Sequence, residues 1–316
     1  MMLWASQNDN YEAATGCLQR FLGVDADDSQ LHRLVKEYGS LLEEQSTELS
    51  RDSFLHQERH SRTLSTDEVV YAMADGCQVP TRPCQEGSSW KEMKLGRLFF
   101  EQEHLQITGK ANMIRQSSYV AHFGTHQEFT KKFEQVVDLY EKHQQNLVFI
   151  NDGAKWINDW INTNYPQATN ILDFYHAAEY LHDFAKVFYG KKATQQAAQW
   201  VTQQKELLNN DQIAQCIEQI EALTCRSQVK KQAQQRILTY YRNNQDRMYY
   251  KTYRKRGLLI GSGPIESAHR FVIQKRMKQS GQKWTKQGGQ RIVNLKVANL
   301  NQQWGKVVQL IKNKAA

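Results

Sequence analysis

The stretch LVFINDG, residues 147–153, decides the fold class of this 316-residue chain. Its four consecutive apolar residues predict a short buried strand, and the Asp-Gly pair predicts a sharp turn at the strand's carboxyl end. Further along, residues 154–164 predict a helix, 170–174 a second strand and 175–189 another helix. Strands that alternate with helices in this way indicate an α/β protein whose helices pack on a sheet.

Three more strands are expected upstream of this stretch. They cover residues 69–76, 93–100 and 118–123, and an amphipathic helix over 127–142 follows them. The order is three adjacent strands and then two strands reached through helices. It predicts an α/β fold of the ribonuclease H-like type, with a mixed five-stranded sheet flanked by helices.

Helical segments are expected around and inside this sheet domain. Residues 194–250 contain no Gly or Pro and are rich in Gln, which predicts an all-helical insertion. Asn10 and Gly23 suit the start and stop of an N-terminal helix, a second helix follows, and the polar residues 52–67 are interpreted as a linker. Pro264 is expected to open a long basic helix, and residues 290–312 form a final one. The predicted domains are 1–66, a helical N-terminal segment with linker; 67–190, the first part of the ribonuclease H-like core; 191–257, the helical insertion; and 258–316, the second part of the core with basic helices.

The two N-terminal helices have two open interpretations. Two short helices joined by a tight turn fit a DNA-reading helix-turn-helix. However, six carboxylates between residues 25 and 44 would face DNA phosphates unfavourably. A helical packing or dimerisation element is the alternative.

Charge is distributed very unevenly along the chain. Residues 1–150 carry 15 Lys+Arg and 22 Asp+Glu, whereas residues 151–316 carry 26 and 11. From Arg226 onward there are 21 basic residues and only two acidic ones, Asp246 and Glu266. Such a field is typical of proteins that bind a polyanion, so we expect a nucleic-acid partner rather than a merely solvated basic surface.

Composition excludes several classes of protein. No apolar run approaches the ~20 residues that span a bilayer, and the N-terminal residues lack the basic and apolar regions of an export signal. Five cysteines, none in a Cys-x-x-Cys pair, disfavour a disulfide framework and a structural zinc site. We therefore expect a cytoplasmic protein without a membrane partner.

Three carboxylates are the candidate metal ligands. Asp75 and Asp152 each end a predicted strand and precede a Gly, and Glu266 lies in the first turn of the Pro264 helix. In the predicted strand order the two aspartates converge, and three hard oxygen donors suit Mg²⁺ or Mn²⁺. Taken singly, each acid has a plainer explanation, because Asp-Gly is a common turn and Glu266 could simply favour the helix dipole.

The motifs around these acids resemble those of the DDE transposases of bacterial insertion sequences. The first two runs are DG at 75–76 and INDGAKWI at 150–157. Three others are similar to the ISKra-type group: ILDFYHAAEYL at 171–181, IGSGPIESA at 260–268, and Arg-x-Lys-Gln-Ser-Gly-x-x-Trp at 276–284. The resemblance covers about residues 67–304.

The resemblance implies a catalytic triad of Asp75, Asp152 and Glu266 that holds two Mg²⁺ ions, with Mn²⁺ as a substitute. Asp75 would bridge the ions; one would activate water and later the freed 3′-OH, and the other would stabilise the leaving oxygen. The implied partners are terminal inverted repeats and target DNA, bound by a homodimer in the nucleoid. The N-terminal region before the catalytic domain is shorter than is usual in such transposases, so a truncated copy with weak end recognition is expected.

For other residues, a functional role and a structural role are equally supported by the sequence. Asp173-x-x-His176 could bond a scissile phosphate or leaving oxygen, or could be a structural capping pair. Trp284 could stack on an unpaired base or belong to the core. Backbone phosphates would be neutralised by Lys275, Arg276, Lys278, Lys283 and Lys286.

We therefore predict an insertion-sequence transposase that cleaves DNA strands and transfers them. A ribonuclease H-like nuclease or resolvase is the alternative enzyme, because fold and metal chemistry alone do not separate the two. A truncated copy that acts only as a DNA-binding repressor is the alternative without catalysis.

Overall fold

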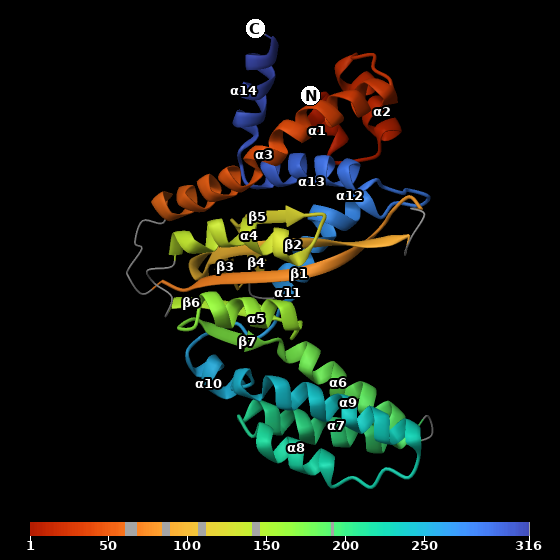
Figure 1. Cartoon of the computed structure of the whole chain (residues 1–316), viewed down its shortest axis with the longest axis vertical. Coiled ribbons are helices and arrows are strands. Elements are labelled where there is room, and N and C mark those ends of the chain that lie inside the picture. Colours follow the sequence, from red (N-terminus) through yellow and green to blue (C-terminus); the bar gives the residue numbers. More distant parts are fainter. Residues whose placement is uncertain (61–67, 84–88, 107–111, 141–145, 191–192, 316) are drawn as a thin grey trace. The chain divides into compact units, whose positions relative to one another are not determined.

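Figure 1 shows the computed structural model, which describes residues 1–60, 68–83, 89–106, 112–140, 146–190 and 193–315. The chain divides into two compact units. The first comprises residues 1–147 and 263–316, and the second comprises residues 148–262. Each unit is described separately below.

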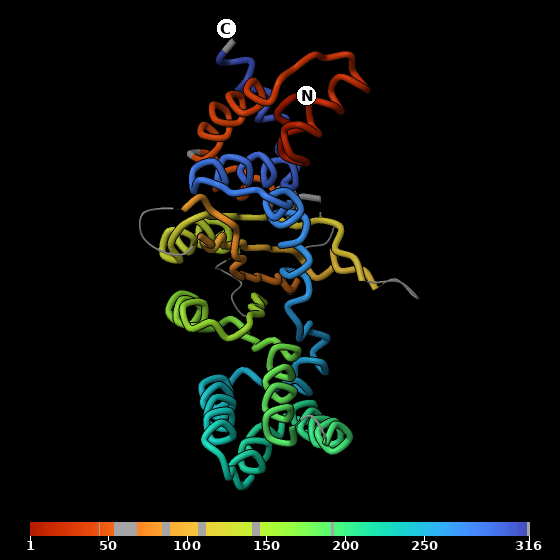
Figure 2. The backbone as a smooth tube through the Cα atoms, turned by 90° about the vertical axis from the view of Figure 1, so that its right-hand side faces the viewer, coloured from red at the N-terminus to blue at the C-terminus, as the bar shows by residue number. Residues whose placement is uncertain are grey.

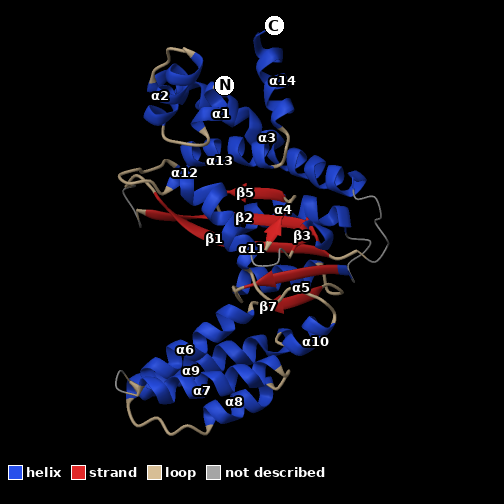
Figure 3. Cartoon of the chain, turned by 180° about the vertical axis from the view of Figure 1, so that it is seen from behind, coloured by secondary structure: helices blue, strands red, loops and turns tan. Residues whose placement is uncertain are grey.

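The protein is an α/β protein with a mixed five-stranded sheet in the order β5-β2-β1-β6-β7, flanked by helices, as the sequence predicted. The first unit contributes three antiparallel strands: β1 (Val70–Pro80), β2 (Trp90–Phe100) and β5 (Ser118–His122) (Figure 3). β6 (Leu147–Asn151) and β7 (Thr169–Leu172) pair in parallel. A two-stranded sheet of β3 (His104–Leu105) and β4 (Met113–Ile114) follows the short helix η1 (Glu101–Glu103).

Strand β1 is longer than predicted. It was expected to turn at Gly76, but it continues to Pro80, and Asp75 and Gly76 pair with Leu95 and Lys94 of β2. Asp75 is therefore inside a strand, which corrects its predicted place at a strand end. The extension is stabilised by its neighbour β2, which offers hydrogen-bonding partners over its full length.

The N-terminal helices are α1 (Met2–Ser6), α2 (Tyr11–Leu22) and α3 (Asp28–His60). The predicted caps of α2 are confirmed: the Asn10 side chain accepts a hydrogen bond from Ala13 N, and Gly23 ends the helix at φ +63°. The linker prediction is wrong over residues 52–60, because α3 runs through them; residues 61–67 lie outside the described part.

Serine side chains explain why a polar segment is helical there. The Ser50 hydroxyl donates to the carbonyl of Tyr119 (2.6 Å), and the Ser118 hydroxyl donates to the Ser53 hydroxyl (3.2 Å). Both α3 serines are buried against β5. A polar sequence can therefore form a packed helix when its small polar groups find partners on the sheet.

Helices of the C-terminal part of the chain also pack on the sheet. The Pro264 helix begins as α11 (Gly263–His269), passes through the π-helical turn η4 (Arg270–Gln274) and ends as α12 (Lys275–Met277). α13 (Lys286–Leu300) packs along α3, and in Figure 2 the two lie side by side. The predicted single helix over 290–312 is two helices, because the chain turns at Gln302 (φ +59°) before α14 (Trp304–Ala315). α4 (His126–Val137) packs on β2 and β5.

The second unit is mainly helical beyond its two strands. α5 (Lys155–Asn164) connects β6 to β7, and α6 (Phe174–Tyr189) follows β7. The predicted helical block is confirmed as α7 (Thr194–Asn209), α8 (Ile213–Glu221), α9 (Gln228–Asn244), η3 (Gln245–Arg247) and α10 (Tyr250–Lys255). Within the described ranges, no helix combines the length and the apolar character needed to cross a membrane.

Candidate active site

Asp75 is the candidate acid of strand β1. Its side chain is 34% exposed, and its Oδ1 accepts a hydrogen bond from the Gly76 amide (2.6 Å). Its Oδ2 lies 3.4 Å from Nε2 of His269, a side chain that is only 3% exposed. Both oxygens contact the protein, but because about a third of the side chain is exposed, an external ligand can still reach the carboxylate.

His269 is a residue that sequence reasoning missed. It is the last residue of α11, one turn after Glu266, so the two side chains lie on the same face of the helix. Burial opposes the charged ring, but Asp75 and Cys77 outweigh it and raise the pKa of His269 to about 9. The ring is therefore protonated at neutral pH. The three-residue spacing from Glu266 was the available signal.

Cys77 completes this cluster two residues along β1, on the same face of the strand as Asp75. Burial opposes ionisation of its thiol, but hydrogen bonds and charge from His269 and Lys278 lower the pKa of Cys77 overall. Asp75, Cys77 and His269 thus form a pair of acidic groups around one buried cation.

Glu266 lies in the first turn of α11, as predicted, and is exposed. The start of this helix is attached to the sheet by Arg97 of β2, whose Nη1 donates to the carbonyl of Pro264 (2.6 Å). Nε of Arg97 donates to the Ser117 hydroxyl (2.8 Å), and the side chain is buried. Arg97 therefore fixes the helix that presents Glu266, a role that the sequence did not reveal.

Asp152 is the candidate acid of the second unit, and its predicted position is confirmed. β6 ends at Asn151, and the chain turns at Gly153 with φ +92°, a conformation that side chains rarely adopt. Oδ1 of Asp152 accepts the Ala154 amide (2.9 Å), and the Tyr240 hydroxyl donates to the Asp152 carbonyl (2.7 Å). The turn is thus held from both the helix start and α9.

A buried polar network supports this turn from behind. Nη1 of Arg247 donates to Oδ1 of Asn151 (3.0 Å) and to Oδ1 of Asn170 (3.1 Å), and the Asn151 side-chain amide donates to the same Asn170 oxygen (3.1 Å). Arg247 comes from the helical block, so that block helps to set the end of β6. Burial lowers the pKa of Arg247, with partial compensation from Tyr240 and Asp246.

Asp173 is fully buried, and its carboxylate is occupied by the chain itself. Oδ1 accepts the amides of Tyr175 (2.5 Å) and His176 (3.1 Å) at the start of α6. Oδ2 accepts the Ser262 amide (2.6 Å) and the Ser262 hydroxyl. This favours the structural capping role over proton transfer for Asp173.

His176 is less enclosed than Asp173. Its side chain is 36% exposed, and its Nδ1 lies 3.1 Å from Oε2 of Glu179. The Asp-x-x-His motif is therefore held together through the His176 backbone amide, while the imidazole pairs with a glutamate further along α6.

The donor chemistry of the three predicted acids fits a hard divalent cation. Asp75, Asp152 and Glu266 offer carboxylate oxygens, the ligands that Mg²⁺ and Mn²⁺ prefer, and none of the three is buried. Asp173 fits less well because its oxygens already accept four hydrogen bonds.

The predicted DNA-contacting cations differ in exposure. Lys275, Lys278, Lys283 and Lys286 are exposed on the first unit. Arg276 is not: it is 2% exposed, and its Nε donates to the carbonyl of Ser6 (2.8 Å). The structure therefore favours a structural role for Arg276 over a contact to DNA phosphate.

Trp284 is half-buried, which is compatible both with stacking on a base and with packing against the core. Its indole Nε1 donates to the carbonyl of Met277 (3.0 Å), and its backbone bridges to the end of β1 through Pro80 and Arg82. The guanidinium of Arg276 lies 4.9 Å from its ring centroid. Trp284 is thus fixed at a surface cavity.

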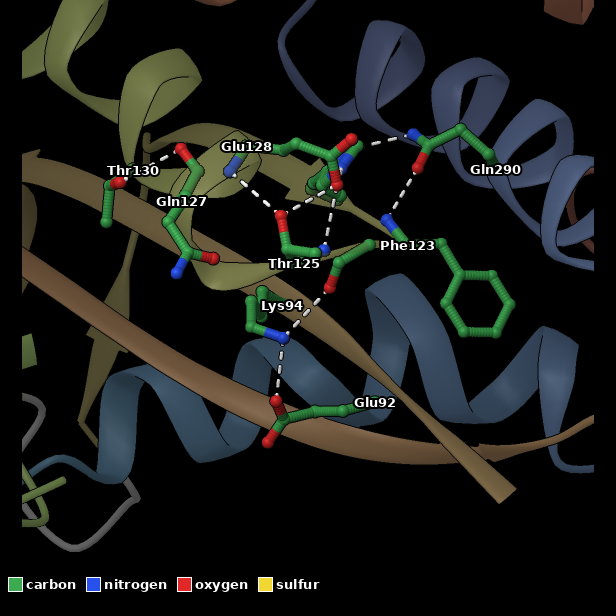
Figure 4. Close-up of polar contacts among 11 residues, drawn as sticks. Glu92, Lys94, Phe123, Thr125, Gln127, Glu128, Thr130 and Gln290 are labelled. Carbon is green, nitrogen blue, oxygen red and sulfur yellow. Dashed lines mark hydrogen bonds and ion pairs between the residues drawn. The ribbon is translucent and has the colours of Figure 1, made fainter. Parts of the chain in front are cut away.

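The loop after β5, residues 123–125, lies near Trp284, because both line a second surface cavity. Several hydrogen bonds hold this loop, as Figure 4 shows. Thr125 and Glu128 form a reciprocal capping box at the start of α4. Oε1 of Gln290 accepts the Phe123 amide (2.6 Å), and Nζ of Lys94 donates to the carbonyl of Gly124 (3.0 Å) while pairing with Glu92 (2.7 Å). The loop is therefore held from β2, α4 and α13 by contacts within the protein.

Comparison with known proteins gives a family. The model of the family described as "Uncharacterised protein family (UPF0236)" matches residues 5–314. A relative from Streptococcus gallolyticus, named "UPF0236 protein in vanSb 3'region", is 26% identical over 252 residues, which cover 76% of this chain and 52% of the relative. The chain thus spans about half the length of that relative. With a match over nearly its whole length, this chain belongs to the UPF0236 family.

Proposed function

We propose that this protein is a DDE-type transposase with a ribonuclease H-like catalytic domain, which cleaves DNA strands and joins them to a target. The observation that carries the proposal is that the three acids picked out by the resemblance each lie on a firmly anchored backbone. Asp75 lies in a paired strand, Asp152 in the Gly153 turn, and Glu266 on the helix anchored by Arg97. Anchored, accessible acids are what chemistry on phosphate needs.

In this proposal Asp75, Asp152 and Glu266 hold Mg²⁺. When bound, Mg²⁺ supplies a Lewis acid for displacement at phosphorus. The exposed lysines of residues 275–286 bind the DNA backbone, and a second protomer completes a homodimer on DNA.

A cleavage assay tests the proposal. The substrate is duplex DNA taken from both sides of the reading frame, incubated with the purified chain and Mg²⁺. We expect site-specific nicks with wild type and none above background with Asp75→Asn, Asp152→Asn or Glu266→Gln. Asp159→Asn, at an exposed acid of α5 paired with Lys155, is the matched control and should cleave like wild type.

The products separate the proposed transposase from a nuclease. Strand transfer joins the freed 3′ end to a second DNA, so a labelled target plasmid should acquire the donor end. Cleavage without any joined product would indicate a nuclease or resolvase instead of a transposase. Cleavage that persists undiminished in Glu266→Gln would show that Glu266 is not part of the active site.

A further inference from the structure

A cavity of about 490 Å³ lies in the first unit beside Trp284. It is bordered by α2, α3, the end of β1 and the segment from α12 to α13. Five cations line it: Lys36, Arg82, Arg276, Lys283 and Arg291. None of the lining residues within the described part of the chain is acidic.

The back of this cavity is preformed. Arg276 is buried there with its guanidinium 5.3 Å from the ring centroid of Tyr11 and 4.9 Å from that of Trp284. The Ser6 carbonyl and the Gln282 side chain bind the guanidinium, and the Met277 carbonyl binds the indole. A cation and two aromatic rings are therefore held in place without a ligand.

The rim carries the cations that a ligand can reach. Lys36, Arg82 and Lys283 are exposed, and Arg291 is half-buried with its Nε bound to the Ser40 hydroxyl (2.8 Å). Among the described residues, none of these four side chains is within ion-pair distance of a carboxylate. Four rim cations that form no ion pair with the described carboxylates favour an anionic ligand.

We infer that this cavity binds one nucleotide unit of a DNA strand, with its phosphate on the rim cations and its base beside Tyr11 and Trp284. The inference depends on the proposed function in one respect: it is the proposed function that makes the bound strand DNA. Guanidinium and ammonium groups are the usual partners of phosphate. The volume exceeds what one phosphate needs and lies within the 300–1,000 Å³ range of small-molecule sites.

The aromatic rings favour a nucleotide over an acidic peptide. Every base has a π-face and can stack on an aromatic side chain regardless of sequence, whereas an aspartate or glutamate side chain has none. The inference also gives the N-terminal helices a part, because Tyr11 of α2 and Lys36 of α3 line the site. They would then complete a pocket rather than read DNA as a separate helix-turn-helix.

A binding experiment without metal tests the inference. The probe is a fluorescein-labelled single-stranded oligonucleotide of mixed sequence, titrated by anisotropy in EDTA at several salt concentrations. The pocket variant is Lys36→Gln with Lys283→Gln. The matched control is Lys131→Gln with Lys312→Gln, two exposed lysines that do not line the cavity.

We expect the pocket variant to bind about tenfold more weakly or worse at low salt. Its log–log salt slope should be lower by about 0.7, because both lysines contact the one phosphate in the cavity and each phosphate contact on a single strand contributes about 0.7. The control pair should bind like wild type. Equal losses in both pairs would mean that the effect is general surface charge and would overturn the inference.

Competition identifies the ligand class. A nucleoside monophosphate should displace the probe from wild type at lower concentration than inorganic phosphate at equal ionic strength. Tyr11→Leu, checked for folding by thermal unfolding, should remove that advantage. Displacement by phosphate or by poly-glutamate as readily as by the nucleotide would overturn the assignment of a nucleotide site.

These outcomes are independent of the cleavage test. If the pocket variant loses oligonucleotide binding while wild type never cleaves DNA, the proposed function fails and the pocket stands. If cleavage is established and the two lysine pairs behave alike in EDTA, only the pocket fails.

Discussion

Asp75 shares its surroundings with a buried, protonated imidazole. Because the pKa of His269 rises from 6.5 to about 9 in the folded protein, the charged ring stabilises the fold. That contribution is fully present below about pH 6.5 and is lost as the pH rises through about 9. Its upper bound, from the size of the shift, is of the order of 3 kcal/mol.

Urea unfolding of the metal-free protein between pH 6 and 10 checks this. Wild type should lose stability across the upper part of the range, whereas His269→Gln should be less stable at pH 6 and show a flatter profile. Cys77→Ser separates the thiol's share, since Cys77 also favours the charged ring. A wild-type profile as flat as that of His269→Gln would contradict the raised pKa.

Arg97 is the second residue whose contacts support the candidate site, because it links the sheet to the start of α11. Arg97→Met should leave the Pro264 carbonyl and the Ser117 hydroxyl without their donor and cost about 2–3 kcal/mol of unfolding free energy. It should also reduce DNA cleavage, because Glu266 loses its anchor. Arg115→Met, at an exposed arginine paired with Glu103, is the control and should change thermal stability by less than about 1 kcal/mol.

At the scale of elements, α3 and α13 pack in close contact. A Cβ atom on Gly39 would lie 2.7 Å from the Arg291 Cβ and 2.8 Å from its carbonyl oxygen. The Gly39 carbonyl also accepts the Asn294 side-chain amide (3.0 Å). Gly39 is therefore required by the packing of two helices that are about 250 residues apart in the chain.

Gly39→Ala should destabilise the protein by about 1–3 kcal/mol, because overpacking outweighs the better helix propensity of alanine. Gly16→Ala in α2 is a matched control: nothing lies within 4 Å of the added atom, so it should stabilise by up to about 1 kcal/mol. Thermal unfolding of the two variants gives the comparison. A stabilised Gly39→Ala would show that the helices can separate at no cost.

At the scale of the whole molecule, the proposed binding of DNA depends on net charge. The chain carries +8 overall, and the excess is concentrated after residue 226. Of the five predicted phosphate contacts, we test Lys275, Lys278 and Lys286 on duplex DNA, because Arg276 is buried and Lys283 lines the cavity.

Replacing Lys275, Lys278 and Lys286 together by Gln should lower the log–log salt slope for duplex binding by about 2.7, at about 0.9 per contact. Affinity should fall for all sequences alike, because phosphate contacts carry no sequence information. Anisotropy titrations over a salt series measure the slope. The control variant Lys131→Gln with Lys312→Gln gives the change in salt slope per removed charge at unrelated sites. If that change is as large per charge as in the triple variant, residues 275–286 do not form a DNA-binding face.

Local sequence was sufficient for many elements and for the local positions of two candidate acids, Asp152 and Glu266. Apolar runs and helical periodicity depend only on near neighbours, so β6, α5, α6 and the helical block were predicted with the right type and order. The caps Asn10 and Gly23 and the turn at Asp152-Gly153 were also predicted, because they depend on the conformational freedom and hydrogen bonds of two or three adjacent residues.

What the sequence could not determine depends on partners distant in the chain. Asp75 is inside a strand because β2 continues beside it, and α3 continues past residue 52 because Ser50 and Ser53 meet β5. Arg276 is buried because the Ser6 carbonyl and the Tyr11 ring, over 260 positions earlier, surround it. The cost of burying a charge or a hydroxyl is offset only when a partner is present. That partner is set by the tertiary structure, which alone decided which polar residues face solvent and which hold the candidate site together.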